Sequence, residues 1–270
     1  MKDFKDKVVL ISGSSRGVGL ALSKEFVKRG AKVVINARGE KRLNQAKREI
    51  LDMGGKVAAV CGDVGVWEDA QKIIQTALDR FGQLDILINN AGIPMRGSFE
   101  KLSVDVCRRM VDTNLIGSIF LTKAAVPHII EAQGQIFFVS SIAGLFGMPQ
   151  SSLYCACKGS LTNFSDSLRI ELEANGVHTG VIYLGFTEND PEKRILSCDG
   201  SLVAPNRPAH HSQQKAAQII LKAVEKRKKK VVMTPIGKLS WIAHRISPVL
   251  VEKIILKAQS SRWKIYNRFV

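Results

Sequence analysis

Residues 7–19 read KVVLISGSSRGVG, an apolar run that passes directly into a loop with three glycines. The run Lys7–Ser12 is short and apolar, which is typical of a strand buried on both faces of a parallel sheet. Residue spacing then predicts a helix from about Gly17 that stops at Gly30, and a second apolar strand follows at Lys32–Asn36. Strand, glycine loop, helix and strand in this order predict a βαβ unit.

The glycine loop has the composition of a pyrophosphate cradle. Glycines allow tight backbone geometry and close approach of a ligand, while the N-terminus of the helix offers N–H donors and a favourable dipole. A glycine triplet alone is a weak signal, but its place between strand and helix outweighs the alternative of a turn that binds nothing. We therefore expect a dinucleotide to contact the whole loop: Gly13, Ser14, Ser15, Arg16, Gly17, Val18 and Gly19.

The end of the second strand bears on which dinucleotide binds. An acidic residue there would hold the ribose hydroxyls of NAD(H), but the strand ends Asn36-Ala37-Arg38. Arg38 can make a bidentate contact to the 2′-phosphate of NADP(H), and Arg16 in the glycine loop can approach the same group. The sequence therefore favours NADP(H), against the alternative that both arginines are solvated surface residues.

The alternation of apolar runs and helical spacing continues along the chain. Further apolar runs cover residues 57–61, 84–88, 135–140 and 178–184. This pattern predicts an α/β fold, a doubly wound parallel sheet of the Rossmann type between two layers of helices. We expect one dinucleotide-binding and catalytic domain over residues 1–235, followed by a basic amphipathic helical extension over residues 236–270.

Loops at the carboxyl ends of the strands should face the ligand. Asp63 and Val64 follow the third run. Asp63 can accept a hydrogen bond from the adenine amino group or, as an equally weighted alternative, cap the next helix. The fourth run ends in Asn89-Asn90-Ala91-Gly92, where asparagine can tie loop backbones together.

Ser141, Tyr154 and Lys158 form a candidate proton-transfer site. The fifth run ends in serine, and Tyr154 and Lys158 are four residues apart on one helical face. A tyrosine with a pKa of about 10 is a poor acid–base catalyst at neutral pH, but a nearby ammonium group and a positively charged nicotinamide favour the phenolate. Tyr154 can then exchange a proton with an alcohol oxygen while hydride moves to or from the nicotinamide, with Ser141 holding the carbonyl oxygen.

These motifs together resemble the short-chain dehydrogenase/reductase family over about residues 5–235. The resemblance rests on the glycine loop, the Asn89–Gly92 segment, Asn114, Ser141 and Tyr154-x-x-x-Lys158. It implies that Tyr154 is the acid–base group and that Lys158 lowers the pKa of Tyr154 and holds the nicotinamide ribose. It also implies that Ser141 orients the substrate and that Asn114 supports a water-mediated proton relay.

The resemblance further implies the cofactor contacts. Besides the glycine loop, Tyr154 and Lys158, these contacts involve Arg38 for the 2′-phosphate, Asp63 and Val64 for adenine, Asn90 for the adenosine side and Thr187 for the carboxamide, with Ala91 and Gly92 as further cofactor contacts. A homodimer or homotetramer is also implied. One position departs from the family pattern, because Leu184 stands where proline is usual and would stiffen the turn. No proton-transfer group is affected, so we expect activity to survive.

Substrate signals lie in the last third of the chain. Residues 188–214 are rich in Pro, Asn, Asp and Ser and are placed to form a lid over the substrate. His210 and His211 in this segment have no carboxylate or cysteine partners of metal-site spacing, so we expect no metal. Residues 191–270 hold 17 basic and 4 acidic residues, and therefore carry 13 of the 16 net positive charges.

The basic extension has several interpretations. Trp241, Ile242 and Ile246 alternate with cationic residues, as in a helix that lies in an anionic membrane interface. Equally weighted is an extension that packs on its own domain or on another subunit. A basic face also suits docking of an acidic carrier protein, whereas the lack of aromatic–basic interleaving argues against nucleic acid.

We therefore expect an NADP(H)-dependent oxidoreductase for a ketone or secondary alcohol, with a long-chain lipid or steroid-like substrate favoured. A 3-oxoacyl-carrier-protein reductase and a catalytically silent NADPH-binding regulator are the alternatives. No apolar run reaches the roughly 18–20 residues of a spanning helix, so we expect a cytoplasmic protein whose membrane contact is at most peripheral. The five cysteines are odd in number and match no zinc spacing, which favours packed, reduced thiols.

Overall fold

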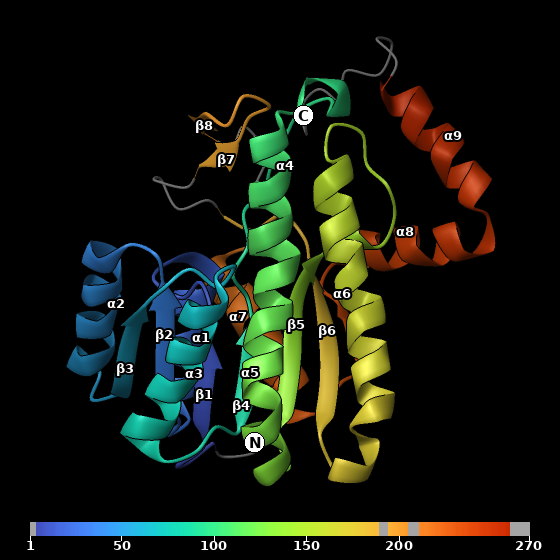
Figure 1. Ribbon diagram of the computed structural model, residues 1–270. Coiled ribbons are helices and arrows are strands. Elements are labelled where there is room, and N and C mark those ends of the chain that lie inside the picture. The colour runs from blue at the N-terminus through green and yellow to red at the C-terminus, as the bar shows by residue number, and fades with distance from the viewer. Residues whose placement is uncertain (1–3, 189–193, 205–210, 260–270) are drawn as a thin grey trace.

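A computed structural model of the chain describes residues 4–188, 194–204 and 211–259 (Figure 1). The strands of the central sheet are β1 (Val8–Ile11), β2 (Lys32–Ala37), β3 (Lys56–Cys61), β4 (Ile86–Asn89), β5 (Gln135–Ser141), β6 (His178–Leu184) and β9 (Lys230–Val232). They lie in the order β3-β2-β1-β4-β5-β6-β9, and every pair is parallel. The strand order reverses at β1, which confirms the predicted doubly wound sheet and places its ligand crevice at the carboxyl edge of β1 and β4.

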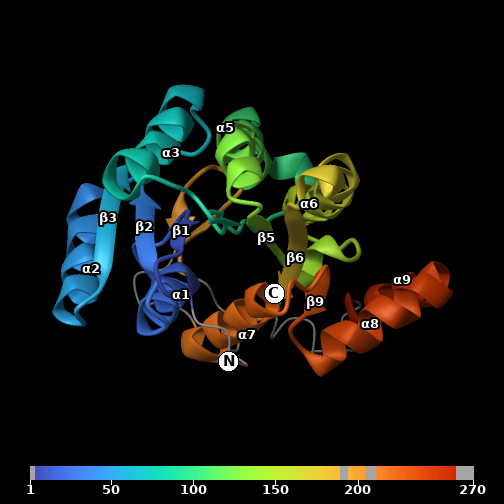
Figure 2. The ribbon, with the colours of Figure 1, turned by 90° about the horizontal axis from the view of Figure 1, so that it is seen from below.

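Helices cover both faces of the sheet. The α-helices of the described residues are α1 (Gly17–Lys28), α2 (Glu40–Asp52), α3 (Trp67–Phe81), α4 (Val104–Val111), α5 (Gly117–Glu131), α6 (Ser152–Glu171), α7 (Gln213–Glu225), α8 (Pro235–Ile246) and α9 (Pro248–Gln259). Figure 2 shows α3, α5 and α6 along one face and α1 and α7 along the other. Val8 and Leu10 pack toward the first group, whereas Val9 and Ile11 pack toward the second. Burial on both faces explains why the strands are continuously apolar.

The predicted lid segment is described in part. Its described residues include a two-stranded antiparallel hairpin, β7 (Ile195–Leu196) and β8 (Leu202–Val203). Leu196 pairs with the loop after β4, since its N–H donates to the carbonyl of Pro94 at 3.0 Å and its own carbonyl accepts from Arg96 at 2.9 Å. Residues 189–193 and 205–210, which include His210, lie outside the described residues.

The two basic parts of the last third of the chain lie at opposite edges of the sheet. Residues 226–230 come before or at the start of β9, whereas α8 follows it, so the parallel sheet separates them. The Arg227 guanidinium donates to the carbonyls of Gln133, Gly134 and Gly176, each at 3.2 Å, and thereby holds the basic run at the amino edge. Helices α8 and α9 lie beyond β6 and β9, outside the two helical layers (Figures 1 and 2).

Two further findings concern the extension and the thiols. Within the described ranges no helix is both long and apolar enough to cross a membrane, and residues 260–270 of the predicted extension lie outside those ranges. The five cysteines are all free, but only Cys155 and Cys157 are buried. The expectation of packed thiols therefore holds for these two and is wrong for Cys61, Cys107 and Cys198, which are half-buried because they lie at loops or at a strand or helix surface.

Candidate active site

The glycine loop approaches the loop after β4 so closely that side chains are excluded. Gly13 and Gly17 have positive φ angles of 62° and 60°. A Cβ on Gly13 would lie 2.8 Å from the Cα of Ala91, and one on Gly19 would lie 2.6 Å from the carbonyl oxygen of Gly13. At Gly17, by contrast, a Cβ would meet nothing within 4 Å. The loop is therefore open beside Gly17, where the first N–H groups of α1 lack intrahelical acceptors and can receive a pyrophosphate.

Buried polar side chains fix this loop in place. The Asn90 amide donates to the carbonyls of Ser12 and Gly13, at 2.8 and 3.1 Å. The Ser12 hydroxyl accepts from the N–H groups of Asn90 and Ala91, both at 3.0 Å. Asn90 thus ties loop backbones together, as one of its predicted roles required. Its contact with a nucleotide stays a prediction.

A second polar cluster connects the loop with β2. The Ser14 hydroxyl donates to the carbonyl of Ile11 at 2.5 Å and accepts from the N–H of Asn36 at 3.0 Å. The buried amide of Asn36 donates in turn to the carbonyls of Val60 and Gly62, at 3.2 and 3.0 Å. Neither Ser12 nor Asn36 was assigned a role from sequence. The signal that could have found them is a polar residue at the end of each of two neighbouring apolar strands.

Arg38 and Asp63 lie together at the carboxyl edge of β2 and β3. The guanidinium Nη1 of Arg38 is 3.4 Å from the Oδ2 of Asp63, and both side chains are partly exposed. Asp63 does not cap α3, so that alternative is wrong. Its Oδ1 accepts from the N–H of Gly65 at 3.0 Å, while Asp69 from the first turn of α3 accepts from the N–H of Asp63 at 2.7 Å.

Three further predicted cofactor contacts, Val64, Arg16 and Ser15, differ in how far their side chains are buried. The Val64 side chain is buried in the core cluster that includes α3 and α5, so its backbone is the part that remains for an adenine contact. Arg16 is the residue before α1 and has an extended backbone and a half-buried side chain. Ser15 is also half-buried in the glycine loop.

Lys158 is a buried cation beside β5. Its side chain is 4% exposed, and its ammonium donates to the carbonyl of Val139 at 3.0 Å. Burial disfavours the charged form and lowers the pKa of Lys158 from 10.5 to about 8. The same turn of α6 is held to β5 because the Ser140 hydroxyl donates to the carbonyl of Lys158 at 2.8 Å. At neutral pH Lys158 is therefore mainly an ammonium group in a low-dielectric site.

Asn114 lies in a π-helical turn, Asp112–Ile116, between α4 and α5. Its buried amide donates to the carbonyls of Ile93 and Met110, at 3.1 and 3.0 Å, and its Oδ1 accepts from the N–H of Ile93 at 3.1 Å. Such π turns are rare and are frequent at functional sites. A Cβ on Gly92 would lie 2.8 Å from the Oδ1 of Asn114 and 3.1 Å from the Nζ of Lys158. The structure thus brings Asn114, Lys158 and Gly92 together.

Ser141 and Tyr154 belong to the two segments that flank a pocket, the end of β5 and the first turn of α6, although neither residue lines the pocket itself. Ser141 ends β5, and its hydroxyl accepts from the N–H of Ala143 at 3.2 Å. Tyr154 lies in the first turn of α6, half-buried against a small apolar cluster that includes Met95 and Leu196. The described part of the lid segment, through Leu196, therefore packs in the same cluster as Tyr154.

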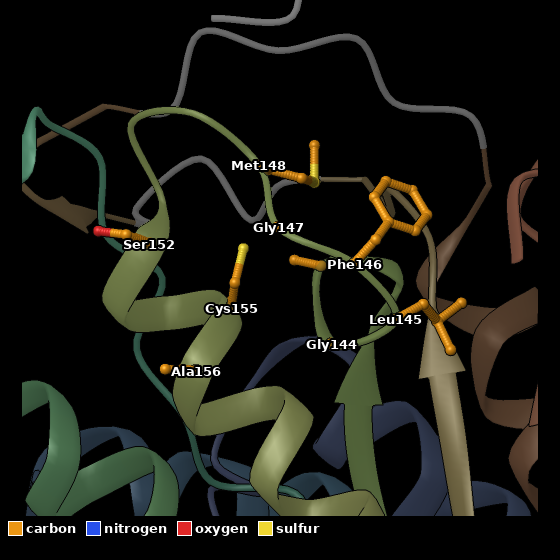
Figure 3. Close-up of a pocket in the computed structure, with 9 residues that line it drawn as sticks. Gly144, Leu145, Phe146, Gly147, Met148, Ser152, Cys155 and Ala156 are labelled. Carbon is orange, nitrogen blue, oxygen red and sulfur yellow. The ribbon is translucent and has the colours of Figure 1, made fainter. Parts of the chain in front are cut away.

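The pocket itself has a volume of about 580 Å³. It is lined by Ala143, Gly144, Leu145, Phe146, Gly147, Met148, Ser152, Cys155 and Ala156. Figure 3 shows the loop Gly144–Met148 facing the first turns of α6, with the Cys155 thiol directed into the space between them. Sequence reasoning missed this apolar wall. The signal was the apolar triplet Leu145, Phe146 and Met148 directly after the serine strand.

Thr187 lies beyond the end of β6. It is buried and forms an isolated bridge with His211, whose carbonyl accepts from the N–H of Glu188 at 2.8 Å. Leu184, which stands in place of the usual proline, is paired in register with Ser141. Thr187 is therefore at the same carboxyl edge as the other candidate residues.

Comparisons with known proteins bear on the fold and on the family of the chain. A family model described as short chain dehydrogenase matches residues 7–197. The protein named 11-beta-hydroxysteroid dehydrogenase-like 4A of Arabidopsis thaliana is 40% identical over 185 residues, and the match covers 68% of this chain and 62% of that relative. Ketoacyl reductase HetN of Nostoc sp. is 30% identical over 261 residues, covering 94% and 90%. A short chain dehydrogenase/reductase from Burkholderia phymatum, solved in complex with NAD, has a TM-score of 0.82 at 20% identity, covering 93% and 96%.

Proposed function

The chain belongs to the short-chain dehydrogenase/reductase family, an oxidoreductase family acting on CH–OH and C=O groups, and we propose that it is an NADP(H)-dependent enzyme that interconverts a ketone and a secondary alcohol. The observation that carries the proposal is the meeting of Lys158 and Asn114 at Gly92, one helical turn from Tyr154. The close-fitting glycine cradle supports a dinucleotide beside this group.

We assign the proton transfer to Tyr154. During reduction its hydroxyl donates a proton to the ketone oxygen, and the Lys158 ammonium stabilises the phenolate that remains. A pKa of about 8 keeps Lys158 charged at neutral pH. The Ser141 hydroxyl holds the substrate oxygen, and Asn114 supports the path by which a proton returns to the tyrosine. When bound, the nicotinamide supplies or accepts the hydride.

The preference for NADP(H) rests on the end of β2. The strand ends Asn36-Ala37 and Arg38 follows, so no acidic residue is present to hold the ribose hydroxyls, and the buried Asn36 amide is already used by the carbonyls of Val60 and Gly62. Arg38 is half-exposed, and its 3.4 Å contact with Asp63 is long for a hydrogen bond between charged groups. Its guanidinium is therefore available for a bidentate contact with a 2′-phosphate.

The pocket supports an apolar ketone as substrate. Its wall of Leu145, Phe146 and Met148 offers a hydrophobic surface, and its volume of about 580 Å³ suits a long-chain lipid or steroid-like molecule. The steroid dehydrogenase-like relative supports the same class. Since the chain spans 62% of that relative's length, the substrate remains part of the proposal.

A carrier-bound 3-oxoacyl chain is the second candidate. The relative named as a ketoacyl reductase matches 94% of this chain, and the exposed Lys238 and Arg245 of α8, which follows β9 at the carboxyl edge, offer complementary charge to an acidic carrier protein. A homodimer or homotetramer and a cytoplasmic location with peripheral membrane contact also belong to the proposal.

The decisive experiment measures NADPH and NADH oxidation by absorbance with long-chain keto-lipids, steroid ketones and short 3-oxoacyl thioesters. Tyr154→Phe should lower turnover by about 10²–10⁴-fold while NADPH affinity is kept. Tyr183→Phe is the matched control, because the Tyr183 hydroxyl pairs with Thr162 at 2.8 Å within the domain. Tight NADPH binding without turnover of any ketone would overturn the proposal in favour of a silent regulator.

A further inference from the structure

Helices α8 and α9 carry half of the exposed large apolar side chains in the described chain. These residues are Ile236, Leu239, Ile242, Ile246, Val249, Leu250, Ile254 and Leu256. Leu239 is 68% exposed and Ile246 is 79% exposed. So many exposed apolar side chains on two consecutive helices are unusual for a surface and indicate an interaction site.

The apolar stripe of α8 faces away from its own domain. Trp241 packs against the main core cluster, and a Cβ on Gly237 would lie 2.8 Å from the side chain of Ile142, so these residues mark the inner side of α8. Leu239 and Ile246 are seven residues apart and share the opposite side of the helix. The domain therefore buries one side of α8 and leaves a second apolar side without a described partner.

The charges around this stripe identify its partner. The exposed cationic side chains of α8 and α9 are Lys238, Arg245, Lys253 and Lys257, against the single carboxylate of Glu252. A second copy of the chain would bring like charges together in a symmetric interface. An anionic lipid surface instead complements both features, because acyl chains receive the apolar side chains and headgroups receive the cations.

The pocket shares a wall with α8. Phe146 lines the pocket, and its ring lies 5.8 Å from the ring of His244 on α8, measured between centroids. Ile142, which directly follows Ser141, contacts the start of the same helix at Gly237. Phe146 thus connects the pocket lining with α8.

We propose that the outward faces of α8 and α9 dock on an anionic lipid surface and that the pocket takes its apolar ketone from this surface. The lipid docking stands on the exposed apolar residues and cations alone. The ketone route rests also on the proposed function. Docking in this position removes the step in which a poorly soluble ketone crosses water.

The test uses the full chain and co-sedimentation with phosphatidylcholine vesicles, with and without phosphatidylserine. We expect binding to the vesicles that contain phosphatidylserine, weakened by added salt. The double variant Leu239→Glu/Ile246→Glu should bind at least about tenfold more weakly, since two buried aliphatic side chains are lost and two repelled charges are added. Ile170→Glu is the matched control, because Ile170 on α6 is 75% exposed and should leave binding unchanged.

Several results would overturn the lipid docking. The first is absence of vesicle binding by the native chain. The second is a loss of vesicle binding in Ile170→Glu equal to that in the double variant. The third is a native oligomer that binds no vesicles and dissociates in the double variant. The last result would assign the face to a second copy. Unfolding midpoints of the variants should match the native midpoint, because all three positions are exposed.

Turnover separates the two proposals. A water-soluble ketone should be reduced at equal rates by the native chain and the double variant, whereas a vesicle-embedded ketone should be reduced more slowly only by the variant. If the soluble ketone is not turned over by either protein, the proposed function fails while the lipid docking stands on its own readout. If the embedded ketone is reduced equally by both, the route from the lipid is wrong.

Discussion

The ammonium nitrogen of Lys158 lies 3.0 Å from the carbonyl oxygen of Val139, within a side chain that is only 4% exposed. A buried cation with a neutral partner is costly, because a carbonyl dipole replaces only part of the lost hydration. The depressed pKa of about 8 expresses this cost. The fold therefore keeps a charge at a position where an apolar side chain would be more stable, which is expected where the charge serves chemistry.

Lys158→Met should stabilise the protein and abolish its turnover. The pKa change from 10.5 to about 8 means that burial of the charge destabilises the folded chain by about 3 kcal/mol, which Lys158→Met removes. Loss of the hydrogen bond to Val139 offsets about 1 kcal/mol of this gain. We expect a net gain of about 2 kcal/mol in the free energy of unfolding at neutral pH. Urea denaturation measures it. Lys123→Met, an exposed lysine on α5, controls for the removal of one positive charge.

The pH dependence of stability provides an internal check on the comparison between Lys158→Met and the native chain. Between the folded pKa of about 8 and the unfolded value of 10.5, the unfolded chain binds a proton that the native chain has lost, so native stability rises with pH in this window. The advantage of Lys158→Met over the native chain should therefore be complete below pH 8 and disappear towards pH 10.5. An advantage that does not change with pH would contradict the assignment to the buried charge.

Ketone reduction should lose efficiency as the pH rises through about 8, because Lys158 then loses the charge that stabilises the Tyr154 phenolate. The free enzyme carries this pKa, so kcat/KM for the ketone is the quantity to measure across neutral and alkaline pH. NADPH titration over the same range is the control. Saturating NADPH at each pH keeps the expected contact of Lys158 with the nicotinamide ribose out of the profile, and a profile without a fall near pH 8 would contradict the role of the ammonium.

Much of the fold could be predicted because burial leaves a local record. The strands could be predicted from their short apolar runs. The end of α1 could be predicted from Gly30, because glycine readily adopts the left-handed backbone that ends a helix, and Gly30 has a φ of 81°. The anchoring of residues 226–230 at the amino edge could not be predicted. It depends on the three carbonyls that Arg227 contacts, which come from segments far away in the sequence.

For the site, the sequence identified groups but not their surroundings. Tyr154 and Lys158 share a helix, so their spacing alone places them on one face. The contact of Asn114 and Lys158 with Gly92 joins three segments, and no local pattern encodes it. The Asp63 cap, one of two equally weighted alternatives, rested on residue type alone, and it was wrong because the chain turns through Gly65 before α3 begins.

Gly13→Ala should be more destabilising than Gly17→Ala. Both residues have φ near 60°, so each substitution costs about 1–2 kcal/mol of backbone strain. Only at Gly13 does the new Cβ also approach the Cα of Ala91, to 2.8 Å, which adds about 1–3 kcal/mol. Urea denaturation without cofactor measures the difference. Equal losses would mean that the loop after β4 moves freely away from the glycine loop.

Arg38→Ala should reverse the cofactor preference. A bidentate contact between a guanidinium and a phosphate contributes about 1.5–3 kcal/mol, so we expect a loss of about 10–100-fold in kcat/KM for NADPH. NADH, which lacks the phosphate, should be used about as well as before, or better, because Asp63 loses its 3.4 Å partner and can accept from a ribose hydroxyl. Arg48→Ala is the matched control. Arg48 is an exposed arginine on α2, the helix that follows Arg38, and its removal should leave kcat/KM unchanged for both NADPH and NADH. An equal loss for both cofactors would instead assign Arg38 to the stability of the β2 edge, since the 2′-phosphate is the one group that distinguishes them.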